Sequence, residues 1–317
     1  MLQHATTLVT FPSGATDGAS AVQELVLLPA QPPGSEPAGA EGPGVGPHFP
    51  PGALGLIVDT TPFHPVDHTW PDQPGDTGTV LVDGVGHPVI DSVTGAIGPQ
   101  GQFAIGAAIP ARRGDEEWTW HVVHVLEAGP DAERLRGANA LLRVDAPRRR
   151  ALSAAHTGCH LMALALNEAL AERWRKAPGR EDSFGRPDFD AIAMEQSRMD
   201  EHASTDRYRI GKSLRKKGFD PDGLAGRLPE VTDRVNARLA DWLAADAPLR
   251  VEVFGGEKSA GLTARREWVC ELPQGTARIF CGGTHLSRLG ELADLHTTLS
   301  LSADGTELVA VTVPKLR

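Results

Sequence analysis

Several features that would assign a compartment or a covalent framework are scarce or absent in this chain of 317 residues. Its three cysteines are odd in number and lie far apart in the sequence, which argues against a disulfide framework. No apolar run approaches the roughly 20 residues of a membrane-spanning helix. The first residues, MLQHA, lack the basic and apolar regions of a signal peptide. We therefore expect a cytoplasmic protein that has no membrane partner.

Basic residues are also fewer than acidic residues. The chain has 31 Lys and Arg against 41 Asp and Glu, a formal net charge of −10 at pH 7. Such a charge argues against general nucleic-acid binding, and we expect no DNA partner. Residues 207–217 are a local exception, because they contain basic residues and no acid. These basic residues are Arg207, Arg209, Lys212, Arg215, Lys216 and Lys217. The segment is either a solvated charged face or a surface that contacts phosphates.

Glycine and proline are abundant, with 35 Gly and 25 Pro, and they concentrate in the first third of the chain. Residues 31–52 are interpreted as a Gly/Pro-rich loop. Short apolar or alternating runs separated by Gly-rich turns, such as residues 21–29, 55–59 and 118–126, are typical of strands. Many short strands of this kind indicate a small N-terminal β-barrel or a sandwich, and we expect the barrel over residues 1–145.

The character of the sequence changes near Pro147. Residues 148–177 and 224–244 have apolar side chains at helical spacing, and several later segments resemble strands. Those strand-like segments are residues 249–254, 266–272, 276–281, 295–301 and 307–313. We expect residues 188–202 to be irregular or partly helical. The predicted fold class is therefore α+β, with a second α+β domain over residues 146–317.

Two short motifs carry pairs of possible metal ligands at spacing i, i+4. They are HTGCH at residues 156–160 and CGGTH at residues 281–285. Together His156, His160, Cys281 and His285 would complete a tetrahedral zinc shell of three imidazoles and one thiolate. His156 and His160 would lie one turn apart on one face of the predicted helix, which suits shared ligation.

Spacing alone leaves alternatives open. A His-xxx-His pair is expected roughly 0.5 times by chance in such a chain, and a Cys-xxx-His pair roughly 0.1 times. A second His-xxx-His match, formed by His64 and His68, illustrates the point. The two motif histidines could be core or cap residues, and Cys281 a buried thiol. Cys159 is interpreted as a packing residue of the helix, and Cys270 as a core residue of a strand.

The sequence around these motifs resembles the family of editing domains found in alanyl- and threonyl-tRNA synthetases and in freestanding AlaX-type proteins. The segment CGGTHLSRLGEL resembles their Cys-Gly-Gly-Thr-His signature, and HTGCHL resembles their His-Thr-x-x-His-Leu helix. The segments TPFHP at residues 61–65 and QPGDTG at residues 73–78 are similar to their N-terminal Thr-Pro-Phe-Tyr-Pro and Gln-Pro-Gly-Asp-Thr-Gly segments. The motifs occur in the family's order across residues 55–315.

The resemblance implies a trans-editing aminoacyl-tRNA deacylase, a hydrolase that cleaves the ester of a misacylated tRNA. It implies a small β-barrel followed by an editing domain that binds zinc (Zn²⁺) through the four ligands named above. Residues beside the ligands would contact the substrate, and the basic segment 207–217 would contact tRNA. The predicted substrate contacts are Thr157, Gly282, Gly283 and Thr284, with His64, Asp67 and His68 lining the amino-acid pocket. Hydroxyls bonded to backbone, a plain turn and a polar surface loop are the structural alternatives.

One departure from the family pattern bears on the substrate. The sequence VDHTWPD at residues 66–72 replaces a Gly-rich stretch that borders the family's amino-acid pocket, and His64 replaces a tyrosine. This difference resembles the branch that includes fluorothreonyl-tRNA deacylase. We therefore expect fluorothreonyl-tRNA(Thr) as the substrate. Removal of serine or glycine from tRNA(Ala) is the alternative.

The role of zinc and the class of protein have alternatives as well. Zinc could polarise the ester carbonyl, or lower the pKa of a bound water toward about 7. Closed four-ligand shells are usually structural, so zinc could instead only organise the pocket, with a neighbouring hydroxyl of the tRNA activating water. A non-catalytic tRNA-binding module and a zinc hydrolase of small esters are the alternatives from other classes. The oligomeric state does not follow from the sequence.

Overall fold

The computed structural model describes residues 5–29, 49–127, 132–254 and 260–317. The chain divides into two compact units, which we describe separately. The N-terminal unit comprises Met1–Arg149 and Val253–Arg265, and the C-terminal unit comprises Arg150–Glu252 and Arg266–Arg317. The domain limits 1–145 and 146–317 stay a prediction. Residues 30–48, which make up most of the predicted Gly/Pro-rich loop 31–52, lie outside the described residues.

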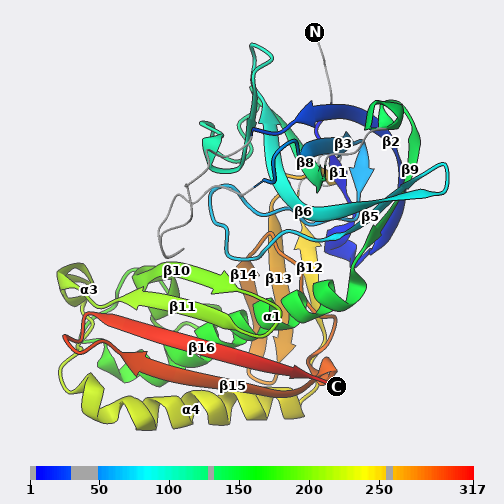
Figure 1. Ribbon diagram of the computed structural model, residues 1–317. Coiled ribbons are helices and arrows are strands. Elements are labelled where there is room, and N and C mark those ends of the chain that lie inside the picture. Colours follow the sequence, from blue (N-terminus) through cyan, green and yellow to red (C-terminus); the bar gives the residue numbers. More distant parts are fainter. Residues whose placement is uncertain (1–4, 30–48, 128–131, 255–259) are drawn as a thin grey trace. The chain divides into compact units, whose positions relative to one another are not determined.

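The N-terminal unit consists mainly of β-strands (blue to green in Figure 1). They are β1 (Leu8–Val9), β2 (Asp17–Leu27), β3 (Leu54–Val58), β4 (Thr60–Thr61), β5 (Gly78–Val82), β6 (Val85–Ile97), β7 (Phe103–Ile105), β8 (Thr119–Leu126) and β9 (Asn139–Val144). Seven of them form a sheet in the order β5-β9-β2-β3-β8-β6-β7, with an additional pairing between β5 and β6. The strand positions predicted from apolar runs agree with β2, β3 and β8. The β-barrel stays a prediction.

Strand β8 is buried on both faces, which explains its high content of β-branched residues. Trp120 and Val122 on one face pack into one apolar cluster. Val123 and Val125 on the other face pack into a second cluster. The side chains of β8 alternate between two faces, as predicted. Both faces are covered by apolar clusters, and neither faces solvent.

The C-terminal unit contains both helices and strands. Its elements are α1 (Ala146–Leu170, whose first residues belong to the N-terminal unit), α2 (Phe189–Ala193), β10 (Met194–Met199), β11 (Ser204–Arg209), α3 (Lys212–Lys217), α4 (Leu224–Ala244), β12 (Leu249–Val253), β13 (Arg266–Leu272), β14 (Gly275–Phe280), β15 (Leu292–Leu301) and β16 (Glu307–Leu316). Short 3-10 segments occur at Phe11–Ser13, Gly106–Ala108, Ala132–Leu135, Ala171–Arg173 and Leu289–Glu291. The helix predicted over 224–244 is confirmed by α4, and the helix predicted over 148–177 ends earlier, at Leu170.

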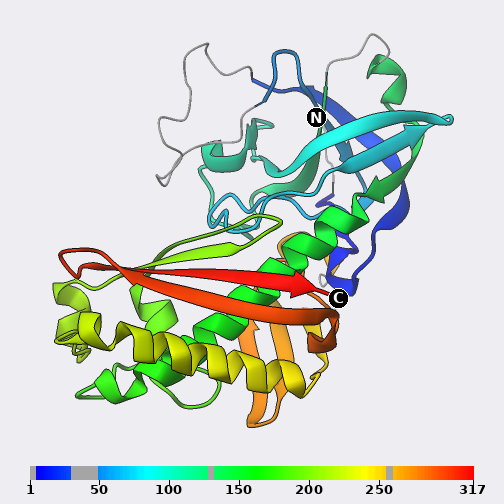
Figure 2. The same ribbon diagram turned by 60° about the horizontal axis from the view of Figure 1, so that its bottom comes forward.

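Two sheets lie on opposite sides of α1 in this unit. One is four-stranded in the order β10-β11-β16-β15, and the other is three-stranded in the order β12-β13-β14. Figures 1 and 2 show α1 (green) running between them. Gly158 packs closely against the four-stranded sheet, because a Cβ atom at this position would meet Leu295 Cδ1 on β15 at 2.8 Å. A glycine inside a helix costs about 1 kcal/mol, which the close contact with the sheet offsets.

Segment 188–202 differs from its prediction. It begins as the short helix α2, but its second half is the strand β10, which pairs with β11. Polar side chains dominate β10, and only Ser197 and Met199 are buried. Such a strand lacks the apolar alternation on which a sequence-based prediction depends.

No helix in the described part of the chain is both long enough and apolar enough to span a membrane.

A buried ion pair fixes segment 61–78 of the N-terminal unit. Arg149 Nε donates to Asp76 Oδ1 at 2.8 Å, and Arg149 Nη2 donates to Asp76 Oδ2 and to the Pro62 carbonyl oxygen. Asp76 also accepts the backbone N–H of His64 at 2.5 Å. The side chains of Arg149 and Asp76 are only 6% and 1% exposed, so neither charge is compensated by water.

We predict that Asp76→Ala lowers the free energy of unfolding by about 3–5 kcal/mol, because it leaves a buried guanidinium without its partner. Thermal or urea unfolding measures the change. The matched control is Asp17→Ala, which removes an exposed partner of Arg143 in the same unit. This control should alter stability little. Equal shifts for the two variants would contradict a structural role of the buried pair.

Candidate metal centre

The four predicted metal ligands lie together in the C-terminal unit. His156 and His160 project from α1, and Cys281 and His285 follow the end of β14. Their ligand atoms all lie within 4.8 Å of one another. Cys281 Sγ lies 3.3 Å from His156 Nε2 and 3.3 Å from His285 Nε2. In a tetrahedral zinc shell a sulfur and a nitrogen ligand are separated by about 3.5 Å, so the spacing suits a shared ion.

The helix presents its two histidines because its opposite side is held by the four-stranded sheet. Gly158 contacts this sheet, and the thiol of Cys159 donates to Asp206 on β11 at 3.4 Å. With 3.6 residues per turn, His156 and His160 then point away from that sheet. The imidazole of His160 packs against Trp268 of β13 with a centroid distance of 5.2 Å. The predicted packing role of Cys159 is confirmed by its buried position.

Burial and protonation fit a bound cation. His160 Nε2 is buried and has no hydrogen-bond partner, an arrangement that destabilises a protein unless a ligand satisfies the nitrogen. Burial lowers the pKa of His160 to about 3, so its imidazole is neutral at physiological pH. A neutral imidazole is the form that binds metal. Three nitrogens and one sulfur are a donor set typical of zinc.

Access to the ligands is uneven. His156 is 1% exposed, whereas His160, Cys281 and His285 are half-buried. Part of the surface of these three residues is therefore in contact with solvent, although the Nε2 atom of His160 is buried.

A further group of contacts orients the ligands. Thr157 Oγ1 accepts the backbone N–H of Leu286 at 3.2 Å and lies 3.4 Å from His285 Nδ1. If His285 Nε2 held a metal, its Nδ1–H would be the donor to Thr157, and this bond would fix the orientation of the ring. The backbone N–H of Gly283 donates to Cys281 Sγ at 3.4 Å, a bond that stabilises a thiolate.

Thr284 and the two glycines lie beside the ligands. Thr284 is 3% exposed, and its hydroxyl lies 2.8 Å from that of Ser153 on α1. Gly282 and Gly283 are absent from the described glycines that have positive φ, so their backbone conformation does not require glycine. Substrate contact by Thr157, Gly282, Gly283 and Thr284 stays a prediction. The hydroxyl contacts of the two threonines within the protein favour positioning roles for them.

His64, Asp67 and His68 belong to the N-terminal unit. His64 is buried, with its ring 5.0 Å from that of Phe11 in an edge-to-face arrangement. Asp67 pairs with Arg113 and accepts the backbone N–H groups of Thr69 and Trp70. His68 Nε2 lies 3.2 Å from the Ala111 carbonyl oxygen, and burial lowers the pKa of His68.

The second His-xxx-His match therefore does not form a metal group. Among the described residues, the group of possible ligands found contains neither His64 nor His68. Their predicted place in an amino-acid pocket stays a prediction.

The basic segment 207–217 is divided between the strand β11 and the helix α3. Arg207 and Arg209 lie on β11, where they pair with Glu307 at 3.0 Å and Glu195 at 3.2 Å. Arg215 pairs with Asp222 at 3.1 Å. Lys212, Lys216 and Lys217 are exposed on α3. The arginines are thus partly neutralised by acids, most of them distant in sequence, and tRNA contact by this segment stays a prediction.

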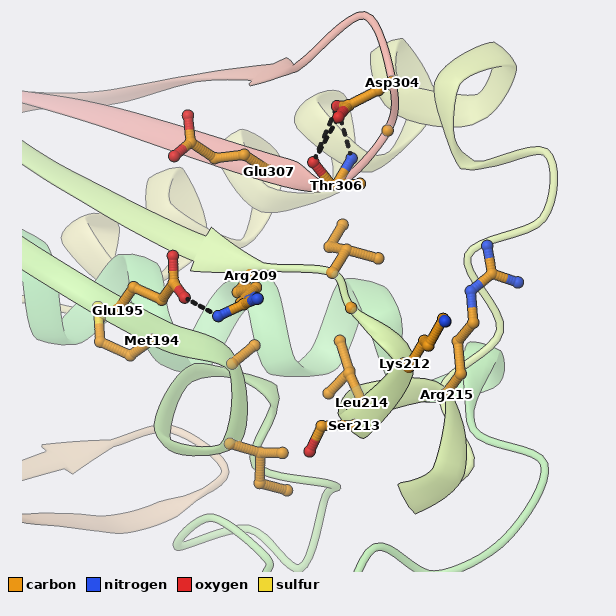
Figure 3. A pocket seen from close by; sticks show the side chains of 15 residues that line it. Met194, Glu195, Arg209, Lys212, Ser213, Leu214, Arg215, Asp304, Thr306 and Glu307 are labelled. Carbon is orange, nitrogen blue, oxygen red and sulfur yellow. Dashed lines mark hydrogen bonds and ion pairs between the residues drawn. The ribbon is translucent and has the colours of Figure 1, made fainter.

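A cavity of about 920 Å³ lies beside this segment, and Figure 3 shows its lining. Arg209, Lys212 and Arg215 line it together with Glu195, Asp304 and Glu307. None of the four metal-centre residues is part of the lining. Its lining is a mixture of carboxylates and basic side chains, and no lining residue belongs to the group of possible metal ligands found among the described residues. We therefore place the candidate chemistry at the metal centre.

Trp268 and the hydrogen bonds of Thr157 were not predicted. Trp268 lies in a strand without any motif, and its ring contacts with His160 and His285 connect it to the site. Thr157 stands between the two helix histidines, so its proximity was visible in the sequence. Its bond to the backbone of Leu286 depends on how α1 meets the loop after β14.

Comparison with known proteins gives a consistent set of relatives. No protein-family model matches the chain. The alanine–tRNA ligase of Halobacterium salinarum is 25% identical over 245 residues, which cover 77% of this chain and 21% of that protein. The ligase of Desulfosudis oleivorans is 25% identical over 240 residues (75% and 22%), and that of a Parafrankia species is 28% identical over 271 residues (82% and 24%). The matched region thus spans less than a quarter of each relative, and no matched name refers to fluorothreonine.

We predict that the purified protein binds about one zinc ion per chain, as a single set of four ligands allows. Cys281→Ser should weaken zinc binding by more than about 100-fold, because even the outer partners of metal ligands contribute about 10–100-fold. Competition with a chromophoric chelator measures the affinity.

The matched control for this prediction is Cys159→Ser. It changes a thiol on α1 that faces the four-stranded sheet, and it should leave zinc affinity unchanged. Equal zinc affinity in Cys281→Ser and in the unaltered protein would contradict the assignment of the metal ligands.

Proposed function

We propose that this protein is a trans-editing aminoacyl-tRNA deacylase, which hydrolyses the ester between an amino acid and the 3′ end of a misacylated tRNA. The observation that carries the proposal is the convergence of HTGCH and CGGTH into one cluster with ligand atoms within 4.8 Å. Both motifs resemble those of alanyl-tRNA editing domains. The similarity to part of three alanine–tRNA ligases, at 25–28% identity, supports the same function.

The chemistry asked of the site is modest. An aminoacyl ester is already labile, so positioning of the ester and of one water contributes much of the rate. Hydrolysis adds water across the acyl–oxygen bond and releases the amino acid and a free hydroxyl of the tRNA. A zinc ion held by His156, His160, Cys281 and His285 would supply a Lewis acid for the ester carbonyl or a water of lowered pKa.

The chain's own residues prepare this site. Burial keeps His160 neutral, and Thr157 orients His285 through its Nδ1. The Gly283 N–H stabilises the Cys281 thiolate. His160, Cys281 and His285 are half-buried rather than fully buried, which is compatible with an ester that binds beside the cluster.

Two substrates compete within this proposal. Residues 66–72 and His64 depart from the family pattern, and this departure favours fluorothreonyl-tRNA(Thr). The names of the relatives, which are all alanine–tRNA ligases, favour tRNA(Ala) carrying serine or glycine. A pocket that must detect one substituent needs a polar contact, since apolar pockets discriminate such differences by only about 1–3 kcal/mol.

Deacylation of a panel of purified tRNAs tests both the deacylase activity and the identity of its substrate. The panel is tRNA(Ala) carrying alanine, serine or glycine and tRNA(Thr) carrying threonine or fluorothreonine. We expect rapid release of one misacylated amino acid, and we expect His156→Ala and Cys281→Ala to slow it by more than about 100-fold, the scale of losing an electrostatic catalyst. His296→Ala, which removes an exposed histidine on β15, should retain full activity.

Each other outcome identifies a different class of protein. Binding of tRNA without release of any amino acid would indicate a non-catalytic tRNA-binding module. Hydrolysis of small esters without affinity for tRNA would indicate a zinc hydrolase of small molecules. Full activity in both His156→Ala and Cys281→Ala would show that the reaction occurs elsewhere.

A further inference from the structure

One of the four candidate ligands has no hydrogen bond that would orient its ring. Histidines that bind metal usually donate their second ring nitrogen to a protein group, which fixes the ring. The contact between His285 Nδ1 and Thr157 Oγ1 is of this kind. The imidazole of His160 makes no hydrogen bond to another residue in the described part of the chain, and its Nε2 is buried. Packing must therefore determine the orientation of His160.

The indole ring of Trp268 on β13 packs against this imidazole. The two ring centroids lie 5.2 Å apart with an angle of 48° between the planes. The same indole lies 6.1 Å from the ring of His285, and both distances are typical of rings in favourable contact. Trp268 is 0% exposed and belongs to the apolar core of the C-terminal unit, so close packing restricts its own position. It thus contacts one ligand from each motif.

Strand β13 also holds the second motif through the backbone. The backbone N–H of Cys281 donates to the Arg266 carbonyl oxygen at 3.1 Å. Arg266 precedes Trp268 by two residues, and Trp268 pairs in register with Ile279 of β14, two residues before Cys281. One strand therefore contacts Cys281 through its backbone and His160 through a side chain, although these two ligands belong to different motifs.

We propose that Trp268 is the positioning residue of His160, whose imidazole it holds in an orientation suited to metal binding. The imidazoles of His156 and His285 also contact that of His160, at 4.8 and 5.0 Å between centroids. Both are ligands that need orientation themselves, whereas Trp268 is fixed by the core. A side chain that is already ordered loses little conformational freedom on binding, so metal affinity rises. Trp268 acts through His160 and needs no contact with the metal.

The inference deepens the proposed function, because it rests on the metal centre at which the ester would be cleaved. It concerns the affinity of the protein for metal, which is measured without any tRNA. Its failure can therefore be told apart from failure of the deacylase.

Zinc affinity, measured by competition with a chromophoric chelator, tests the proposal. We expect Trp268→Phe to weaken zinc binding by about 10-fold and Trp268→Leu by up to about 100-fold, the range for groups that orient metal ligands. The absorption spectrum of the protein loaded with Co²⁺ depends on the arrangement of the ligands, and it should change in both variants.

A third replacement separates the ring of Trp268 from its N–H group. Benzothienylalanine has the same bicyclic shape but carries sulfur in place of Nε1–H. The Nε1–H of Trp268 is buried and has no hydrogen-bond partner among the described residues, so its removal breaks no bond. We therefore expect this variant to retain the zinc affinity and the Co²⁺ spectrum of the unaltered protein.

The matched control is Trp242 on α4, a second tryptophan of the same core that is also 0% exposed. Its indole N–H donates to Gln274 at 2.8 Å, and no ring contact with a metal ligand is found for it among the described residues. Trp242→Phe and Trp242→Leu should lower thermal stability but leave zinc affinity and the Co²⁺ spectrum unchanged. Circular dichroism checks folding, and the two Phe variants decide the comparison if a Leu variant does not fold.

A double-mutant cycle identifies the ligand through which Trp268 acts. In a His160→Ala background, Trp268→Phe should cause no further loss of zinc affinity, because the ring that it positions is gone. In a Cys281→Ser background, the loss of about 10-fold should remain. Equal losses in the two backgrounds would contradict the assignment to His160.

The other outcomes separate this inference from the proposed function. Unchanged zinc affinity in Trp268→Phe, or an equal loss in Trp242→Phe, would overturn the positioning role even if deacylation is rapid. Weaker binding in the benzothienylalanine variant would overturn it too, because the N–H group would then be responsible. Weaker zinc binding confined to the Trp268→Phe and Trp268→Leu variants, together with absent deacylation, would leave the positioning role standing and refute the deacylase.

Discussion

The contact between α1 and the loop after β14 is the interaction on which the rest of the site depends. It brings three imidazoles and one thiol to within 4.8 Å of one another, in a place where His160 Nε2 has no hydrogen-bond partner. Such a cluster is costly to desolvate unless a cation compensates it. A metal bound here would hold together two segments whose ligand pairs are 125 residues apart in sequence, and it would thereby stabilise the local fold.

Contacts with the four-stranded sheet constrain the position of α1. Gly158 allows the helix to approach β15 closely. Cys159 donates to Asp206, a fully buried carboxylate whose pKa is raised to about 6 by burial. These contacts set the rotation of the helix about its axis, and with it the direction of His156 and His160. The packing of residues that are not ligands thereby determines the geometry of the ligands.

Features that depend on residues close together in the sequence could be predicted from it, whereas contacts between distant residues could not. The ligand pairs are local motifs, and α4 has a regular apolar period, so both could be located without a structure. Strand β10 is polar, and the ion pairs of Arg207 and Arg209 join residues distant in sequence. Such features depend on the tertiary arrangement. The same holds for Trp268 against His160 and for Thr157 at His285. The N-terminal barrel and the substrate contacts of His64, Asp67 and His68 stay predictions.

The central claim is that these four side chains together bind one zinc ion beside which an aminoacyl ester is cleaved. X-ray absorption at the zinc edge of the purified protein tests the first half of this claim most directly, because it identifies the ligand atoms themselves. The account predicts one sulfur at about 2.3 Å and three nitrogens at about 2.0–2.1 Å from zinc. A zinc shell without sulfur, or a protein that binds no zinc at all, would contradict it.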